Sequence, residues 1–360
     1  MIRALLVFLI LTASAAQAAM EWFPPRFDGG RLLIVPEPHY NSRDHFGLSL
    51  EAIHPFRTGM QSDLSRDSEF RLLGRVHTTG NGAAEAATTT FFGEGRWYLK
   101  AKMEYRSLIE RFWGVGPDTP DDAEELYRPQ QVRTYVELFH RVVAGLRLGG
   151  RLEWNDFKYV DVEEGGLLDT VDYLGLRGDN ATGIGLVGEW DRRDNVYAPR
   201  RGMYVQGFTM FFLEALNGDY DFQTAHLDLR SFHAVGQRSV LAFQFFAFAN
   251  YGDAPIWRYA ALGGRAHSRG YNRGRFLGRR MAATQLEWRF PVRGRLDMAA
   301  FAGVAAAADD YDDYALETLR PTLGVGWRLH VRKDRDLMLL ADLAFGESNV
   351  EGYLSFGHAF

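Results

Sequence analysis

The residues best suited to chemistry in this 360-residue chain lie in one arginine-rich stretch and in the segment that follows it. Arg269, Gly270 and Tyr271 come first, and Glu287 and Arg289 follow. A guanidinium is planar, always charged, and able to pair bidentately with a carboxylate, while glycine lets a loop turn back tightly. We therefore expect Arg269 to pair with Glu287 and to fix a long loop to the wall that carries Glu287.

These five residues are called the loop latch. By alternation Glu287 shares a face with Gln285 and Arg289, opposite Trp288, so we expect it to face an interior. Breaking the pair would leave a desolvated charge at a cost of roughly 3–5 kcal/mol, less where water screens it. Two roles stay open for the latch. It is either purely structural or it also takes part in gating.

A basic patch surrounds the latch, and its members are Arg265, Arg273, Arg275, Arg279 and Arg280. Such a patch suits carboxylates of a barrel lumen or the phosphates of lipopolysaccharide. Nucleic acid is a poor fit, because only Tyr271 and Phe276 interleave with the arginines and the formal net charge is −5. We expect no nucleic-acid partner.

The sequence gives little indication of a catalytic or metal-binding group of residues. The chain has no Cys, which excludes thiolate metal sites and a Cys nucleophile. Its ten His are scattered, and none lies in a G-x-S-x-G or H-E-x-x-H motif. The acidic run Asp309–Asp313 suits either a solvated loop tip or a divalent cation. We expect no enzyme, no cofactor and no committed metal site.

Alternating strands must position the latch. From Gly145 to Asn155, Leu148 and Leu152 alternate with Arg151 and Glu153, and residues 322–332 repeat the design. Charged residues in mid-strand suit a wet lumen, and aromatic residues gather near strand ends as a membrane interface requires. About 16 strands are expected, near 32–41, 46–55, 68–77, 84–92, 97–109, 131–141, 145–158, 182–191, 202–214, 221–234, 239–251, 281–291, 296–307, 318–332, 337–346 and 351–360. The predicted fold is an all-β, antiparallel transmembrane β-barrel.

The chain divides into three parts. Residues 1–18 carry Arg3, an apolar run and the Ala16-Gln17-Ala18 cleavage site, which is typical of a signal peptide. Residues 19–31 are expected to form a short periplasmic segment, and 32–360 the barrel. Short joints alternate with long segments, as in outer-membrane barrels, so both termini are expected in the periplasm.

A family resemblance emerges from these motifs. Arg269-Gly270-Tyr271 followed by Glu287-Trp288-Arg289-Phe290-Pro291 resembles the bacterial surface antigen family, the superfamily of BamA- and TamA-like outer-membrane assembly factors. Asp191–Asn195 with Pro199–Gly202 is similar to its periplasmic turn, and Phe112–Gly116 to an external-loop signature. The resemblance implies that residues 252–280 form a sixth external loop folded into the lumen between the eleventh and twelfth strands.

Two departures from the family pattern stand out. The resemblance implies N-terminal polypeptide-transport-associated domains, but few residues precede the first strand, so a short form without them is expected. The strand after the latch reads Phe301-Ala-Gly303-Val-Ala305, and Gly303 stands where the family has a second acid for the loop arginine. We expect this change to weaken the latch.

The first and last strands carry the remaining features. Pro36 and Pro38 cannot donate to a ladder, so they either weaken a seam with the last strand near Gly352 and Gly357 or precede the first strand. Phe360, the last residue, resembles the C-terminal signal of outer-membrane barrels.

Two functions stay open. The resemblance implies a factor that inserts proteins, or moves protein or lipid, at the outer membrane of a Gram-negative bacterium. Its partners would be outer-membrane lipids, lipopolysaccharide, unfolded outer-membrane proteins or a periplasmic protein. The alternative is a structural or pore-forming barrel that does not handle clients.

Overall fold

A computed structural model describes residues 25–26, 32–41, 45–58, 68–176, 178–196, 198–332, 337–347 and 349–356. The expected signal peptide over residues 1–18 lies outside these ranges, as do most of residues 19–31 and both Gly357 and Phe360. The expectations attached to these residues remain predictions.

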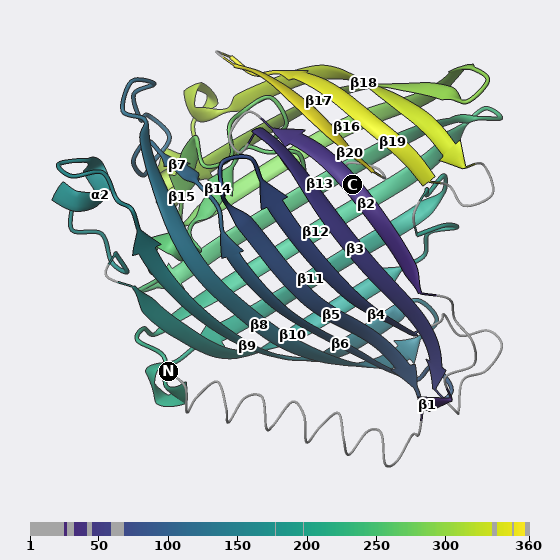
Figure 1. Ribbon diagram of the computed structural model, residues 1–360, viewed down its shortest axis with the longest axis horizontal. Helices are drawn as coiled ribbons and strands as arrows, with labels where there is room; N and C mark the ends of the chain where they lie inside the picture. The colour runs from purple at the N-terminus through teal and green to yellow at the C-terminus, as the bar shows by residue number, and fades with distance from the viewer. Residues whose placement is uncertain are drawn as a thin grey trace.

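Long antiparallel strands make up most of the described chain (Figure 1). Sixteen of the strands in these ranges have seven or more residues: β2 (Leu33–Asn41), β3 (His45–Thr58), β4 (Ser68–His77), β5 (Gly82–Phe92), β6 (Trp97–Ser107), β8 (Glu125–Val143), β9 (Leu146–Val160), β10 (Asp179–Asp191), β11 (Gly202–Phe212), β12 (Phe222–Val235), β13 (Ser239–Gly252), β16 (Arg280–Arg293), β17 (Leu296–Ala308), β18 (Arg320–Arg332), β19 (Leu337–Phe345) and β20 (Val350–Phe356). Each long strand pairs with the next along the chain. The predicted all-β barrel fold of about 16 strands is confirmed.

Short strands and helices lie between the long strands or beside them. Within the described ranges they are β1 (Pro25–Arg26), β7 (Glu110–Phe112), α2 (Leu167–Thr170), η1 (Glu214–Leu216), η2 (Ile256–Arg258), β14 (Ala260–Leu262), β15 (Phe276–Gly278), η3 (Tyr311–Asp313) and η4 (Leu316–Thr318). No described helix has the length and apolar character needed to cross a membrane.

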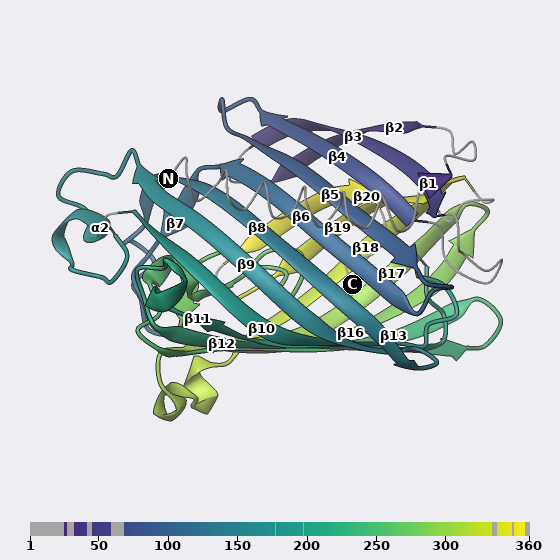
Figure 2. The ribbon, with the colours of Figure 1, turned by 90° about the horizontal axis from the view of Figure 1, so that it is seen from below.

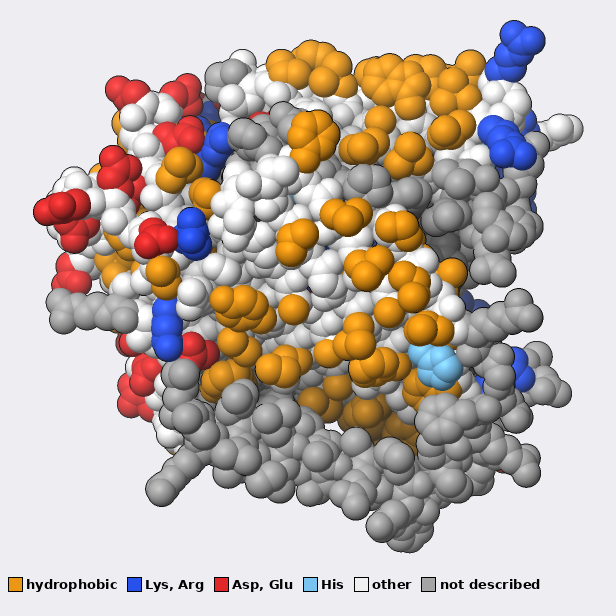
Figure 3. Space-filling view, viewed as in Figure 1, with side chains coloured by type: hydrophobic (Ala, Val, Ile, Leu, Met, Phe, Trp, Pro, Cys, Tyr) orange, Lys and Arg blue, Asp and Glu red, His pale blue; other side chains and the backbone are white. Residues whose placement is uncertain are grey.

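The two faces of the sheet differ as the alternation predicts. In β18, the side chains of Leu323 and Trp327 are 64% and 40% exposed, whereas Arg328 is 1% exposed. In β9, Leu152 is exposed while Glu153 is buried. Apolar side chains spread over the outer surface of the strands (Figure 3). An apolar outer face and a charged inner face are what a bilayer-spanning barrel requires.

The connections lie at the two ends of the barrel, and the end with α2 and β7 is at the left in Figure 2. The long segments 108–124, 161–178, 253–279 and 309–319 lie at one end, called the loop end. The short joints 144–145, 236–238 and 294–295 lie at the other, called the turn end. The segment 253–279 is the sixth connection at the loop end and is called loop 6. It lies between the eleventh and twelfth long strands, β13 and β16.

One longer connection at the turn end matches the family-like turn. The Oδ1 atom of Asp194 accepts hydrogen bonds from the backbone N–H groups of Asn195, Arg200 and Arg201 at 2.9, 2.9 and 3.1 Å. Slight burial raises the pKa of Asp194, but these donors outweigh it and hold the pKa below its ordinary value. The charged form of Asp194 therefore fixes the shape of this turn.

The first and last long strands meet at a seam. Both Pro36 and Pro38 lie inside β2, so they do not precede the first strand. The β2–β3 ladder runs from Leu33 to Asn41 without a break. Because N–H groups alternate in direction along a strand, both missing donors fall on the side of β2 that faces β20. Across that side the described residues show the single pairing Tyr40 with Leu354.

A charge on the outer face tests the membrane assignment. We expect Leu323→Lys to lower the free energy of unfolding by about 2 kcal/mol, because a lysine on the lipid-facing side of β18, three residues from its loop end, must leave water for the hydrocarbon. Urea unfolding of the protein in lipid vesicles measures this. The matched control is Leu316→Lys, at a loop residue that is 86% exposed, where we expect a change within about 0.5 kcal/mol. Equal effects of the two substitutions would contradict the assignment.

Candidate functional site: the loop 6 latch

Loop 6 folds back on itself before it reaches the barrel wall. Strands β14 and β15 form a small hairpin with Leu262 opposite Phe276. At its tip the N–H of Gly264 donates to the carbonyl of Tyr271 at 3.0 Å. Gly270 has φ 94°, and a Cβ there would lie 2.8 Å from the backbone of Phe345 and Gly346. Only glycine fits this conformation and this close approach. Gly270 therefore lets the loop backbone come close enough to the wall for Arg269 to reach it.

Arg269 is the centre of the site. Its side chain is 1% exposed. Its Nη1 donates to Oε2 of Glu287 at 2.7 Å and to Oδ2 of Asp342 at 2.9 Å. Its Nη2 donates to Oε1 of Gln285 at 3.0 Å, and the ring of Phe301 lies 3.4 Å from the guanidinium carbon. The structure thus brings Arg269 and Glu287 together and adds a second carboxylate.

Two further arginines complete a charged group. The Nε of Arg289 donates to Glu287 at 2.8 Å, and the Nη1 of Arg328 donates to Asp342 at 2.5 Å. We call Arg269, Glu287, Arg289, Arg328 and Asp342 the latch cluster. Three guanidinium groups share two carboxylates inside the barrel, so loss of either acid leaves a larger uncompensated positive charge.

The sequence-based interpretation did not include Asp342 and Arg328 in the latch. The strand from Leu337 to Phe345 contains one charged residue, Asp342, and the alternation of both strands turns these two side chains inward. Gly303 does lack the expected acid. The second carboxylate that binds Arg269 comes from Asp342 in β19, and not from position 303 in β17.

The tripeptide also contacts β18, β20 and the connection between β19 and β20. The N–H of Gly270 donates to the hydroxyl of Tyr353 in β20 at 3.2 Å. The Tyr271 hydroxyl donates to the carbonyl of Pro321 at 2.9 Å and accepts from the N–H of Glu347 at 3.2 Å. Loop 6 is therefore attached to one side of the β2–β20 seam.

Comparison with known proteins decides the family. The Omp85 superfamily domain matches residues 40–334, which is most of the chain. The chain belongs to the Omp85 superfamily. This membership makes it an outer-membrane barrel of the BamA-like kind expected for Gram-negative bacteria. No curated protein matches the sequence.

Solved structures share the fold of this Omp85 barrel at low identity. BamA from Haemophilus ducreyi lacking POTRA domains 1–3 has a TM-score of 0.65 and 12% identity, over 96% of this chain and 78% of that one. CdiB from Acinetobacter baumannii has a TM-score of 0.57 and 10% identity, over 91% and 59%. CdiB from Escherichia coli has a TM-score of 0.59 and 8% identity, over 92% and 68%.

The basic patch of this Omp85 barrel lies against carboxylates. Arg275 pairs with Asp121 at 2.6 Å, and Arg273 lies 3.6 Å from Glu110. Arg279 and Arg280 face the acidic run, at 3.4 Å from Asp309 and 3.2 Å from Asp310 respectively. Arg265 is half-buried in the same loop. This arrangement favours pairing within the protein over a free phosphate-binding surface.

The acidic run is occupied by internal contacts. Asp313 accepts hydrogen bonds from the N–H groups of Asp309 and Asp310 at 3.1 and 2.8 Å. Across the described residues no group of three or more acidic or histidine side chains is arranged to hold a metal ion. Three carboxylates of the run, those of Asp309, Asp310 and Asp313, therefore have partners within the protein.

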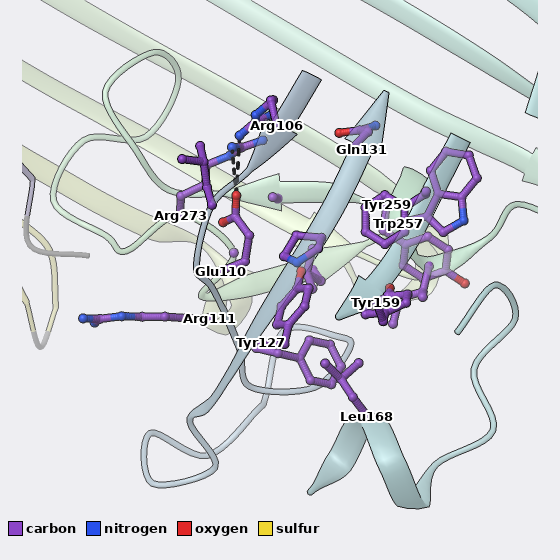
Figure 4. Close-up of a pocket in the computed structure, with 18 residues that line it drawn as sticks. Arg106, Glu110, Arg111, Tyr127, Gln131, Tyr159, Leu168, Trp257, Tyr259 and Arg273 are labelled. Carbon is purple, nitrogen blue, oxygen red and sulfur yellow. Dashed lines mark hydrogen bonds and ion pairs between the residues drawn. The ribbon is translucent and has the colours of Figure 1, made fainter. Parts of the chain in front are cut away.

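A cavity of about 100 Å³ lies between loop 6 and the β8–β9 wall. Tyr127, Tyr159 and Tyr259 line it together with Arg106 and Gln131 (Figure 4). Glu110 lies at one side of it, within 3.5 Å of Arg106. Loop 6 thus leaves a small, mixed polar and aromatic space between itself and this wall.

The latch cluster is open to a direct test of stability. We expect Asp342→Asn to lower the free energy of unfolding by about 3 kcal/mol, because Arg269 and Arg328 lose a buried carboxylate. Lumen water would reduce this figure. Urea titration of the refolded barrel measures it.

The matched control is Asp310→Asn, whose side chain is 78% exposed and pairs with Arg280. We expect it to change stability by less than about 0.5 kcal/mol. If Asp342→Asn were equally mild, Asp342 would contribute nothing to the latch.

Proposed function

We propose that this Omp85 barrel inserts proteins into the outer membrane, or moves protein or lipid across it. The observation that carries the proposal is the attachment of loop 6 to the strands beside the seam. Arg269 binds Asp342 on β19, and Gly270 binds Tyr353 on β20. A movement of the loop would therefore act on the strand that forms one edge of the seam.

The seam itself supports the same proposal. Pro36 and Pro38 remove two donors on the side of β2 that faces β20, and every missing ladder bond lowers the cost of separating two strands. Unpaired strand edges are templates for another strand. An incoming β-strand of a client would pair here once the two strands separate.

We further propose an orientation and partners. The loop end would face the outside and the turn end, with both termini, the periplasm. The partners would be outer-membrane lipids, including lipopolysaccharide, together with unfolded barrel proteins or a periplasmic protein. The role proposed is assembly or transport and not enzymatic.

A second candidate is a structural or pore-forming barrel. It is favoured by the charged interior, where Arg151, Glu153 and Asn155 line one wall and the latch cluster lines another. A lumen of this polarity suits ions and water. The two candidates differ in one respect: the first needs the seam to open and the second does not.

Client folding is the first test. We expect liposomes that contain the barrel to accelerate the folding of a urea-unfolded outer-membrane protein added outside, and we expect Arg269→Ala to lose most of that acceleration. Heat-modifiable gel mobility of the client measures its folding, and the same assay on the barrel verifies that each variant is folded. No acceleration by a folded wild-type barrel would favour the pore, and ion conductance would then be measured.

A reversible crosslink tests whether the seam opens. Tyr40 and Leu354 are paired residues of an antiparallel ladder, whose Cα separation of about 4.5–5.5 Å suits a disulfide. With both changed to Cys in this cysteine-free chain, oxidation should abolish the acceleration and reduction should restore it. The control pair, Leu343→Cys with Gly352→Cys, bridges β19 and β20 and should leave it intact. Equal activity of both oxidised proteins would contradict opening at the seam.

A further inference from the structure

A second arginine of loop 6 enters a charged group on another wall. Arg258, at the end of η2, is 9% exposed. Its Nη1 donates to Oε1 of Glu153 in β9 at 3.0 Å, and the ring of Phe212 lies 4.8 Å from its guanidinium. Its carbonyl accepts from the side-chain amide of Asn250 at 2.8 Å, and Asn250 is fully buried.

Glu153 does not depend on Arg258 for its compensation. Arg133 donates to it at 2.9 and 3.2 Å, and Arg151 donates through Nε at 2.9 Å. Asn155 adds a hydrogen bond at 3.1 Å. These four residues all lie in β8 and β9, so the wall holds its own buried carboxylate. Removal of Arg258 therefore takes away this ion pair between loop and wall without leaving a bare charge in the wall.

Two of the contact points of loop 6, those of Arg269 and Arg258, lie on opposite sides of the barrel. Asp342 is in β19 and Glu153 is in β9. In the sheet the strands follow one another as β9-β10-β11-β12-β13-β16-β17-β18-β19. This is eight steps among sixteen long strands, or half of the circumference. The chain between Arg258 and Arg269 thus runs from one wall to the wall that faces it.

We propose that loop 6 is a brace across the lumen, with Arg258 as a second anchor opposite the latch. Arg258 is a positioning residue that holds the arm of the loop between β13 and β14. Its anchor depends on one carboxylate, and the like charges of Arg133 and Arg151 oppose it. Among the described contacts its guanidinium donates to one side chain, whereas that of Arg269 donates to three. The Arg258 anchor is therefore the weaker of the two and opens first.

Site-specific labelling tests the brace, because the chain has no cysteine of its own. Ala254 is 0% and Ser268 2% exposed, one beside each anchor. With Ala254→Cys as the probe in refolded, liposome-bound protein, Arg258→Ala should raise the rate of labelling by a water-soluble maleimide about tenfold. A charge-assisted hydrogen bond of ordinary strength shifts a local opening equilibrium by at least that factor.

The two probes separate the anchors. With Ser268→Cys as the probe, Arg258→Ala should leave labelling unchanged while Arg269→Ala raises it. Arg258→Lys, which keeps the charge, should restore most of the protection at Ala254→Cys and provides a variant should Arg258→Ala not fold. Arg273→Ala is the matched control, since its side chain is 45% exposed and 3.6 Å from Glu110. Unchanged labelling at Ala254→Cys in folded Arg258→Ala would overturn the proposal.

Conductance provides an independent measurement. A braced lumen should pass little current in a planar bilayer, and Arg258→Ala with Arg269→Ala should pass several times more than either single variant. A double variant no more conductive than Arg269→Ala alone would overturn the second anchor. This inference goes beyond the proposed function, because a barrel with no effect on client folding could still be braced.

Discussion

The burial of the Arg269 guanidinium is the interaction on which this structure depends. A charged group inside the barrel must find carboxylates, and it finds Glu287 and Asp342 on two strands separated by β17 and β18. Those carboxylates are in turn held by Arg289 and Arg328. Arg269 thereby ties loop 6 to two strands at once, because its charge can be compensated only by their two carboxylates.

Strand alternation and local motifs carried the prediction of the fold. A period of two places Leu323 and Trp327 in lipid and Arg328 in the lumen. The sequence of each strand is enough to assign its two faces, without knowledge of the neighbouring strands. The pairing of Arg269 with Glu287 was predicted from the family-like motif of the tripeptide and the following strand, together with the alternation that turns Glu287 inward. Local information therefore sufficed for the barrel and for half of the latch.

The remaining contacts depend on register between distant strands. Asp342 lies 73 residues from Arg269, and Glu153 lies 105 residues from Arg258. Alternation shows that both acids face inward but not at which height along the barrel they lie. That height depends on the stagger of every intervening strand pair. Arg258 has no strand periodicity around it, so its partner emerges only from the three-dimensional structure.

The two anchors and the seam form one mechanical system. The latch attaches loop 6 to β19 and β20, whereas the Arg258 contact attaches it to β9 on the opposite side. A loop held at both points resists outward displacement of the last strands. The strand β20 could move only if the chain between Arg258 and Arg269 extended or if an ion pair broke. Release at Arg258, which Arg133 and Arg151 already oppose, would leave the latch and the last strands free to move together. The same charges that hold loop 6 against the two walls would then determine when the seam can open.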